Sequence, residues 1–194
     1  MKIKESLKPE IILLDGASGV GKSTILQYLK NEYSDQLYVG SKLTNRQGRI
    51  GDTEWEFKFV EIIPKNSKYS FQSVGYYYAI DFEELTNIIK QGITYVISCT
   101  DRNTIEKIKN DFPTISIYVY RAQTRMQVNQ LLIDRGLQNE IDIKIRLAEY
   151  DLIISKYIEN INLYDYVILN IGTVHELYCQ ISNLLSNYSI NKIQ

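Results

Sequence analysis

The sequence contains one histidine and two cysteines among its 194 residues. Cys99 and Cys179 lie far apart and match no spacing typical of zinc or redox sites, so we expect two buried, inert thiols. His175 falls at the predicted start of a helix, where a surface position is expected. These scarcities exclude a disulfide framework and a metal centre built from cysteine and histidine.

Long apolar runs and an excess of one charge are missing as well. Lysine and arginine number 22 against 23 acidic residues, for a net charge of −1. No run approaches the roughly 20 apolar residues that cross a bilayer, and the first five residues lack the apolar core of a signal peptide. We expect a cytoplasmic protein with no membrane or nucleic-acid partner, either a monomer or a homodimer.

Short apolar segments alternate with amphipathic ones along the chain. The predicted strands are residues 11–14, 37–39, 93–97, 115–120 and 166–169. The predicted helices are residues 22–33, 103–110, 140–159 and 173–187, with two more that begin at residues 81 and 124 and end at Gly92 and Gly136. This alternation predicts a single α/β domain, residues 1–194, whose parallel sheet is covered by helices on both faces.

A glycine-rich motif of the form G-x-x-x-x-G-K-[ST] separates the first predicted strand from the first helix. Its residues are Gly16, Ala17, Ser18, Gly19, Val20, Gly21, Lys22, Ser23 and Thr24. In this context the backbone amides and the positive end of the helix hold phosphate oxygens. Lys22 is expected to reach the β- and γ-phosphates of a nucleotide, and Ser23 to ligate Mg²⁺.

Residues 42–80 interrupt the alternation, so the predicted core consists of residues 9–41 and 81–188. Alternating residues predict a strand with one wet face at 54–63, and residues 69–74 are a candidate hairpin partner. A polar loop in this insertion carries Arg46 and Arg49, whose planar guanidinium groups suit a phosphate dianion. The alternative, on their own merits, is a pair of solvated surface arginines.

The chain resembles the guanylate-kinase-like branch of the P-loop nucleoside monophosphate kinases over most of its length. Beyond the P-loop, Arg46 and Arg49 match the family spacing T-x-R-x-x-R, and Asp52 lies where the family has its next acidic residue. Tyr78 ends a segment similar to the family's G-N-Y-Y. The resemblance implies that both arginines and Tyr78 bind the phosphate of the acceptor.

Further matches follow in the second half of the chain, where those of the lid are specific in combination with the P-loop. Asp101 falls on the second aspartate of the family's L-D-x-D strand end; it is either a magnesium-shell or acceptor-binding residue or a helix cap. Arg135 and Arg146 match the arginines of a helical lid, residues 123–148, and Asn170 closes a D-x-V-I-x-N segment at the nucleotide end. The resemblance implies a P-loop kinase fold with a β-rich acceptor-binding insertion.

Five positions depart from the family pattern. Tyr69 replaces the glutamate that reads guanine, Ile80 its serine or threonine partner, Lys42 a loop serine, and Cys99 the first aspartate of the strand end. Because base selection depends on buried polar groups that pair with one ring, guanine discrimination should be lost. Leu131 replaces the first lid arginine, so Arg125 or Arg135 would have to compensate.

These observations favour an ATP- and Mg²⁺-dependent phosphotransferase that acts on a small phosphate-bearing acceptor other than standard GMP. Lys22, Arg135 and Arg146 are the expected catalytic residues. A ribose-bisphosphate-type sugar phosphate kinase, a true guanylate kinase with a substitute base reader, and a catalytically weak binding module remain alternatives. An intact Gly21-Lys22-Ser23 argues against the binding module, and the D-x-x-G and N-K-x-D signals of small GTPases are missing.

Overall fold

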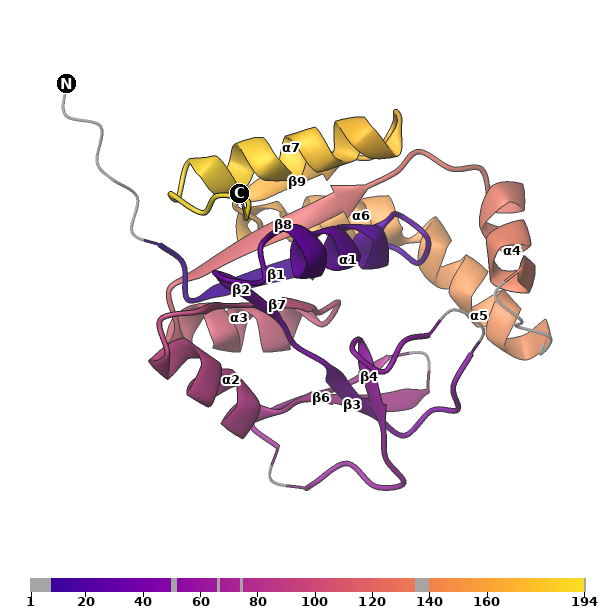
Figure 1. Ribbon diagram of the computed structural model, residues 1–194. Helices are drawn as coiled ribbons and strands as arrows, with labels where there is room; N and C mark the ends of the chain where they lie inside the picture. The colour runs from indigo at the N-terminus through magenta and orange to yellow at the C-terminus, as the bar shows by residue number, and fades with distance from the viewer. Residues whose placement is uncertain (1–7, 50–51, 66, 74, 135–139, 194) are drawn as a thin grey trace.

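The first strand lies at the centre of a parallel sheet (Figure 1). The computed structural model describes residues 8–49, 52–65, 67–73, 75–134 and 140–193. Within these residues five strands pair in the order β2-β7-β1-β8-β9, and every pairing is parallel. Their bounds are Ile11–Asp15 for β1, Leu37–Val39 for β2, Thr94–Ser98 for β7, Thr114–Tyr120 for β8 and Tyr166–Leu169 for β9. The predicted α/β fold is therefore confirmed.

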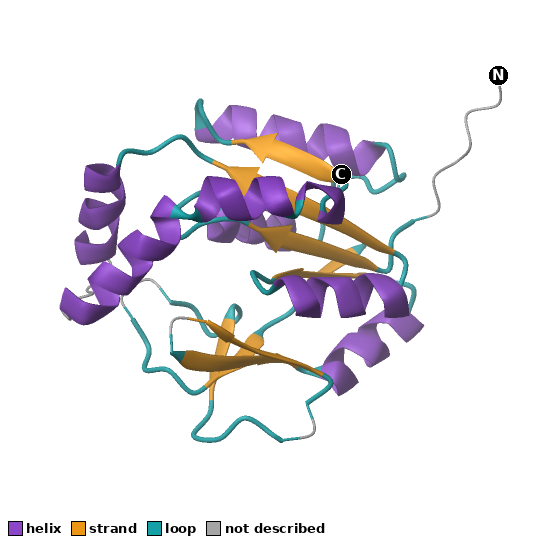
Figure 2. Cartoon of the chain, turned by 180° about the vertical axis from the view of Figure 1, so that it is seen from behind, coloured by secondary structure: helices purple, strands orange, loops and turns teal. Residues whose placement is uncertain are grey.

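Helices cover both faces of this sheet, as Figures 1 and 2 show from opposite sides. Two of them, α1 and α7, contribute to the buried cluster on one face, and α2 and α3 to the cluster on the other. Their bounds are Lys22–Glu32 for α1, Phe82–Lys90 for α2, Arg102–Asp111 for α3 and Val174–Ser186 for α7. All four correspond to helices expected from the sequence.

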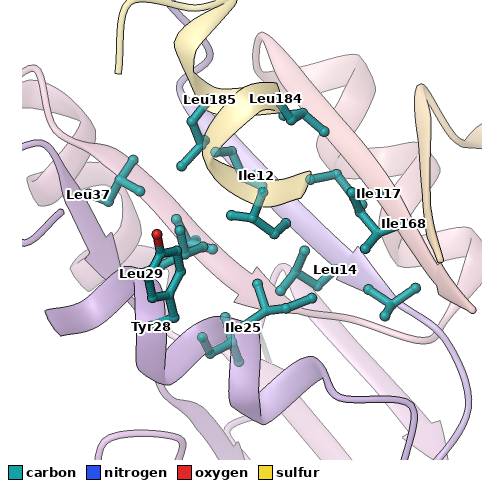
Figure 3. Close-up of a cluster of buried hydrophobic side chains, with 14 of the residues drawn as sticks. Ile12, Leu14, Ile25, Tyr28, Leu29, Leu37, Ile117, Ile168, Leu184 and Leu185 are labelled. Atoms are coloured by element: carbon teal, nitrogen blue, oxygen red, sulfur yellow. The ribbon is translucent and has the colours of Figure 1, made fainter. Parts of the chain in front are cut away.

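The residues of β1 are buried alternately in two apolar layers. Ile12 and Leu14 pack with side chains of α1 and α7 (Figure 3), whereas Ile11 and Leu13 pack in the opposite cluster. Each fully buried side chain of this size contributes on the order of 1.5–3 kcal/mol of stability. This packing holds the carboxyl end of β1 at a fixed position between β7 and β8, where the chain order of the sheet reverses.

A second, mixed sheet lies within the predicted insertion, in the order β4-β3-β6-β5. The bounds are Lys42–Thr44 for β3, Phe57–Phe59 for β4, Tyr69–Ser73 for β5 and Tyr76–Ile80 for β6. The strand predicted at 54–63 is wrong in extent, because the amides of Glu56 and Phe57 both donate to the Thr53 carbonyl and form a turn. The predicted hairpin is also wrong, since β5 pairs with β6, the next strand along the chain, rather than with β4.

Between β8 and β9 the described residues form three helices, with one helix boundary more than the sequence predicts. The helices are α4 (Arg125–Asp134), α5 (Glu140–Asp151) and α6 (Ile153–Glu159), followed by the 3₁₀ turn η1 (Ile161–Leu163). The sequence predicts one helix over residues 140–159, but the chain bends at Leu152. Leu147 of α5 packs on α4, whereas Tyr157 of α6 stacks on Tyr118 of β8 with ring centroids 4.5 Å apart. The two halves are thus anchored to different parts of the molecule.

The two cysteines occupy different environments. Cys99 is buried as expected, but Cys179 is exposed, because it lies on the side of α7 opposite the core residues Leu177 and Ile181. Its sulfur lies 3.5 Å from Nε2 of His175, which is exposed as predicted. In the described part of the chain, no helix combines the length and apolar character needed to cross a bilayer.

Candidate active site

The turn between β1 and α1 has the backbone of an anion-binding nest. Gly16, Gly19 and Gly21 have φ angles of 138°, 83° and 106°, a region that favours glycine. Gly21 is the N-cap of α1, and among the described residues no side chain caps this helix, whereas Thr173 caps α7. The first amides of α1 are therefore left for an anion at the positive end of the helix dipole.

Lys22 and Ser23 are the first residues of α1. Lys22 Nζ donates hydrogen bonds to the carbonyls of Gly16 at 2.6 Å and Ala17 at 2.7 Å, so its ammonium group lies against the turn. Ser23 Oγ is exposed and donates to Glu56 Oε1 at 3.2 Å. A hydroxyl beside a carboxylate provides the hard oxygen ligands that Mg²⁺ prefers, so the residues present fit that ion.

Asn170 reaches the same turn from the end of β9. Its Nδ2 donates to the Val20 carbonyl at 2.8 Å, although 150 positions separate the two residues. The structure therefore brings Asn170 against the glycine turn. The remaining residues of the motif that line the surrounding cleft are Gly16, Ala17, Ser18, Gly19, Gly21, Lys22, Ser23 and Thr24.

Arg46 is held in a rigid ion pair. Its guanidinium group donates to both carboxylate oxygens of Asp52, at 2.6 and 2.9 Å, and to the Gln47 carbonyl at 2.9 Å. Its Cζ lies 4.3 Å from the ring centroid of Phe57, and the residue is only 5% exposed. Burial disfavours the charge, but the carboxylate outweighs it and raises the pKa of Arg46 above its usual value. Arg46 is thus a fixed cation.

Arg49 and Arg146 lie near Arg46, and neither forms an ion pair with a residue that the structure describes. Burial is the main cause that lowers the pKa of both arginines. The positive charge of Arg46 lowers the pKa of Arg49 further, and the charge of Arg49 does the same to the pKa of Arg146. Nε of Arg146 is buried without a hydrogen-bond partner in the described residues. Tyr78, 8% exposed, interacts electrostatically with all three. Three clustered guanidinium groups, of which only Arg46 forms an ion pair among the described residues, leave an excess of positive charge that favours an anion.

One cleft joins the two anion-binding groups. It has a volume of about 890 Å³ and is lined by the glycine turn at one end. Arg46, Arg49, Tyr78 and Arg146 line it at the other. The turn and the arginine loop are far apart in the sequence, and the fold places them across a shared space large enough for two small substrates.

Two expected residues are not placed at the cleft. Asp101 is the N-cap of α3, with its carboxylate accepting from the Thr104 amide at 2.8 Å, so its geometry is that of a helix cap. Arg135 lies outside the described residues. Arg125, one of the two candidates to compensate for Leu131, is exposed and pairs with Asp151. The structure therefore gives no cleft contact to Asp101 or Arg125.

The comparisons with known proteins agree with this geometry. The family model described as guanylate kinase matches residues 8–188. The chain belongs to the guanylate kinase family. This membership makes it a phosphotransferase of the nucleoside monophosphate kinase class.

Individual relatives of this guanylate kinase family member are distant but nearly full-length. A guanylate kinase of Mycoplasmoides gallisepticum is 29% identical over 168 residues, 82% of this chain and 84% of the relative. One from Wolinella succinogenes is 28% identical over 176 residues, 86% of this chain and 79% of the relative. The crystal structure of guanylate kinase from Anaplasma phagocytophilum matches with a TM-score of 0.61 at 18% identity, covering 97% of this chain and 92% of that one, and shows the same fold.

Three of the positions that depart from the guanylate kinase pattern lie in one row across the second sheet. Lys42 on β3 pairs with Ile80 on β6, and Ile80 pairs in turn with Tyr69 on β5. Paired residues on neighbouring strands point to the same face of a sheet. A fourth, Cys99, belongs to the same buried cluster as Tyr69 and Ile80. The departures are therefore neighbours in space.

Sequence reasoning missed two buried carboxylates at the cleft. Glu56 is 7% exposed and accepts the hydrogen bond of Ser23. Asp15, at the end of β1, accepts 2.5 Å hydrogen bonds from the Gly16 amide and the Tyr164 hydroxyl. Asp15 follows an apolar run directly and precedes the motif, which is a detectable signal. Glu56 falls within the strand predicted at 54–63, which has one wet face, so the sequence offered no signal that this carboxylate is buried.

Proposed function

We propose that the chain transfers the γ-phosphoryl group of ATP, bound with Mg²⁺, to the phosphate of a small acceptor other than standard GMP. The observation that carries this proposal is the shared cleft, with main-chain amides at one end and guanidinium groups at the other. Phosphoryl transfer requires mainly positioning and neutralisation of charge, and the cleft residues supply both.

At the nucleotide end, the amides of the glycine turn would hold the phosphates and Lys22 would neutralise the transferring group. Lys22 now bonds to two carbonyls of the turn, and a phosphate there would replace those acceptors. Ser23 would hold Mg²⁺, which when bound screens the phosphate oxygens from one another. Asn170 supports the turn through Val20.

At the acceptor end, Arg46, Arg49 and Tyr78 would hold the acceptor phosphate. The nucleophile is an oxygen of that phosphate, and a phosphate monoester has its second pKa near 6, so it is already deprotonated at neutral pH. No general base is needed. Arg46, fixed by Asp52, would orient the dianion, while Arg49 has fewer partners and would bind it directly.

We further propose that residues 42–80 act as the acceptor-binding insertion and residues 123–148 as a lid. Arg146 lines the cleft from α5 and lies near Arg49, so closure of the lid would add a charge over the reacting groups. Arg135 is proposed to act from the same segment. Excluding water at this point would strengthen each of these interactions.

The position of the Tyr69 side chain supports the loss of guanine recognition. It is fully buried and donates its hydroxyl to Asp111 at 2.6 Å, and it is not among the residues that line the cleft. A sugar phosphate is the second candidate acceptor, because a sugar needs no carboxylate to read a base edge. A catalytically weak binding module is a poorer explanation of an intact Lys22 and Ser23.

The test is an assay of ADP formation from Mg-ATP with a panel of nucleoside monophosphates and sugar phosphates. Lys22→Ala should abolish turnover of every acceptor. Arg49→Ala should raise the acceptor KM by about tenfold or more while leaving the KM of ATP unchanged, since a charge-assisted contact is lost at one end only. Arg125→Ala, which alters an exposed pair with Asp151, is the matched control. Unchanged acceptor kinetics in Arg49→Ala would overturn the proposal.

A further inference from the structure

Lys42 lines the cleft, and its ammonium group is held by a neutral hydroxyl rather than by a carboxylate. Its Nζ donates to Ser98 Oγ at 2.5 Å and lies 4.6 Å from the ring centroid of Phe57. Lys42 makes no ion pair with any described residue. A lysine ammonium has three hydrogen-bond donors, so donors remain beyond the one given to Ser98. Burial lowers the pKa of Lys42, with Glu56 and Cys99 opposing this effect.

The other departing positions near Lys42, which are Tyr69, Ile80 and Cys99, carry no carboxylate that could accept hydrogen bonds from a bound base. Tyr69 points its hydroxyl to Asp111, and Ile80 is apolar and 1% exposed. Burial raises the pKa of the Cys99 thiol to about 12, so this side chain is neutral. Of the row Lys42, Ile80 and Tyr69, only Lys42 lines the cleft, so its remaining donors are the groups of this row that a bound molecule would meet.

Lys42 is close to the arginines that would bind the acceptor phosphate. The Phe57 ring contacts both Lys42 Nζ and the Arg46 guanidinium group, whose Cζ lies 4.3 Å from the ring centroid. Arg46 has its carboxylate in Asp52, whereas Lys42 pairs only with the neutral Ser98. A molecule held by the arginines would therefore place its other end against Lys42.

Resting on the proposed function, we propose that Lys42 with Ser98 forms a hydrogen-bond-donor subsite that selects the acceptor by an unprotonated oxygen at the end opposite its phosphate. A ring carbonyl or a second phosphoryl group supplies such an oxygen. An exocyclic amino group in the same place would be rejected, because it is a hydrogen-bond donor facing the ammonium donors of Lys42, and a buried polar group would then remain unpaired.

The experiment compares acceptors in pairs that differ at one group. The carbonyl arm uses uridine against cytidine 5′-monophosphate and inosine against adenosine 5′-monophosphate. The phosphoryl arm uses ribose 1,5-bisphosphate against ribose 5-phosphate. In at least one arm, the member with the oxygen should have a kcat/KM about tenfold or more above that of its partner. The arm that shows the preference identifies the source of the oxygen.

Variants at Lys42 then test whether this residue causes the preference. Lys42→Met keeps the length of the side chain but removes its charge and donors, and should reduce the ratio within the preferred pair to less than about twofold. Lys42→Arg should retain most of it. Lys58→Met, on the adjacent strand β4, removes an exposed lysine paired with Glu84 and should leave the ratio unchanged.

Equal turnover within every pair, preference for the amino member, or an unchanged ratio in Lys42→Met would overturn the inference. So would a panel in which no member raises the melting temperature above the effect of inorganic phosphate. Failure of the proposed function is recognised separately. In that case Lys22→Ala and Arg49→Ala leave the activity unchanged, whatever substitutions at Lys42 do.

Discussion

Ser23 Oγ donates a hydrogen bond of 3.2 Å to Oε1 of Glu56, a residue 33 positions later in the chain. This contact joins the first turn of α1 to the insertion that carries the arginine loop. A serine that ligates a metal directs a lone pair at the ion and its proton elsewhere. Glu56, 7% exposed, accepts this hydrogen bond, and if Ser23 ligates Mg²⁺ as proposed, Glu56 would be a positioning residue for it.

Glu56→Ala is expected to raise the Mg²⁺ concentration needed for half-maximal activity by about tenfold, as for other losses of a group that orients a metal ligand. Glu56→Gln should retain most of the wild-type response, because its amide oxygen accepts the same hydrogen bond. The measurement is a Mg²⁺ titration at saturating ATP. Glu54→Ala removes an exposed carboxylate two residues away and serves as the control. Equal Mg²⁺ requirements in Glu56→Ala and the wild type would show that Glu56 does not orient Ser23.

The central sheet could be predicted from the sequence because its signals are local. Runs such as residues 11–14 are apolar throughout, and the helices between them have clear caps such as Thr173 and Asp81. The second sheet was harder. Its strands β3 and β4 have three residues each and pair in parallel, so their partner is set by tertiary packing. The bend at Leu152 depends in the same way on what α5 and α6 pack against.

The candidate site also has a part that the sequence predicts and a part that it does not. The glycine turn is one continuous motif, and the spacing of Arg46 and Arg49 is short enough to recognise. The contacts that give these residues their character are not local. Glu56 reaches Ser23 from the insertion, and Lys42 reaches Ser98 across 56 positions. No periodicity in the sequence encodes such contacts, because they arise only when the second sheet packs against the first.

Gly16→Ala should unfold or distort the phosphate-binding turn. Its φ of 138° is unfavourable for a side chain, and a Cβ there would overlap the main-chain oxygen of Val119, which cannot move without breaking the sheet. Gly92 also has a positive φ, of 75°, but a Cβ there would meet no atom within 4 Å, so Gly92→Ala isolates the backbone strain of about 1–2 kcal/mol. In urea unfolding, Gly16→Ala should lose more stability than Gly92→Ala. In a Mg-ATP binding assay, only Gly16→Ala should lose affinity. Normal ATP binding by this variant would contradict the assignment of the turn.

Asp15 should make the stability of the protein depend on pH. Burial raises the pKa of Asp15, and the hydrogen bonds of Tyr164 and Gly16 offset this only in part. A carboxyl group whose pKa is higher in the folded state contributes stability below its unfolded pKa, near 4, and this is lost as pH rises through the folded pKa.

Asp15→Asn keeps the size of the side chain and its acceptor for the Gly16 amide but removes the titration. Its melting temperature should exceed that of the wild type at about pH 8 and lose this advantage at about pH 3. Asp35→Asn, at an exposed position, should show no such trend. An Asp15→Asn variant that is less stable than the wild type at about pH 8 would mean that the ionised carboxylate stabilises the fold.

Arg146→Met should raise the melting temperature in buffer free of phosphate and sulfate while lowering kcat. The wild-type guanidinium group has an Nε without a described partner and lies near Arg49, so its burial costs free energy until an anion is bound. Inorganic phosphate should therefore stabilise the wild type more than the variant.

Arg125→Met is the matched control for this experiment, because it removes an exposed arginine of the neighbouring helix α4 that already pairs with Asp151. It should leave both the phosphate-dependent gain in melting temperature and kcat close to wild type. If Arg146→Met and the wild type gain equally from phosphate, Arg146 does not contribute to the anion site. Its unpaired Nε would then be a structural cost with no counterpart in binding.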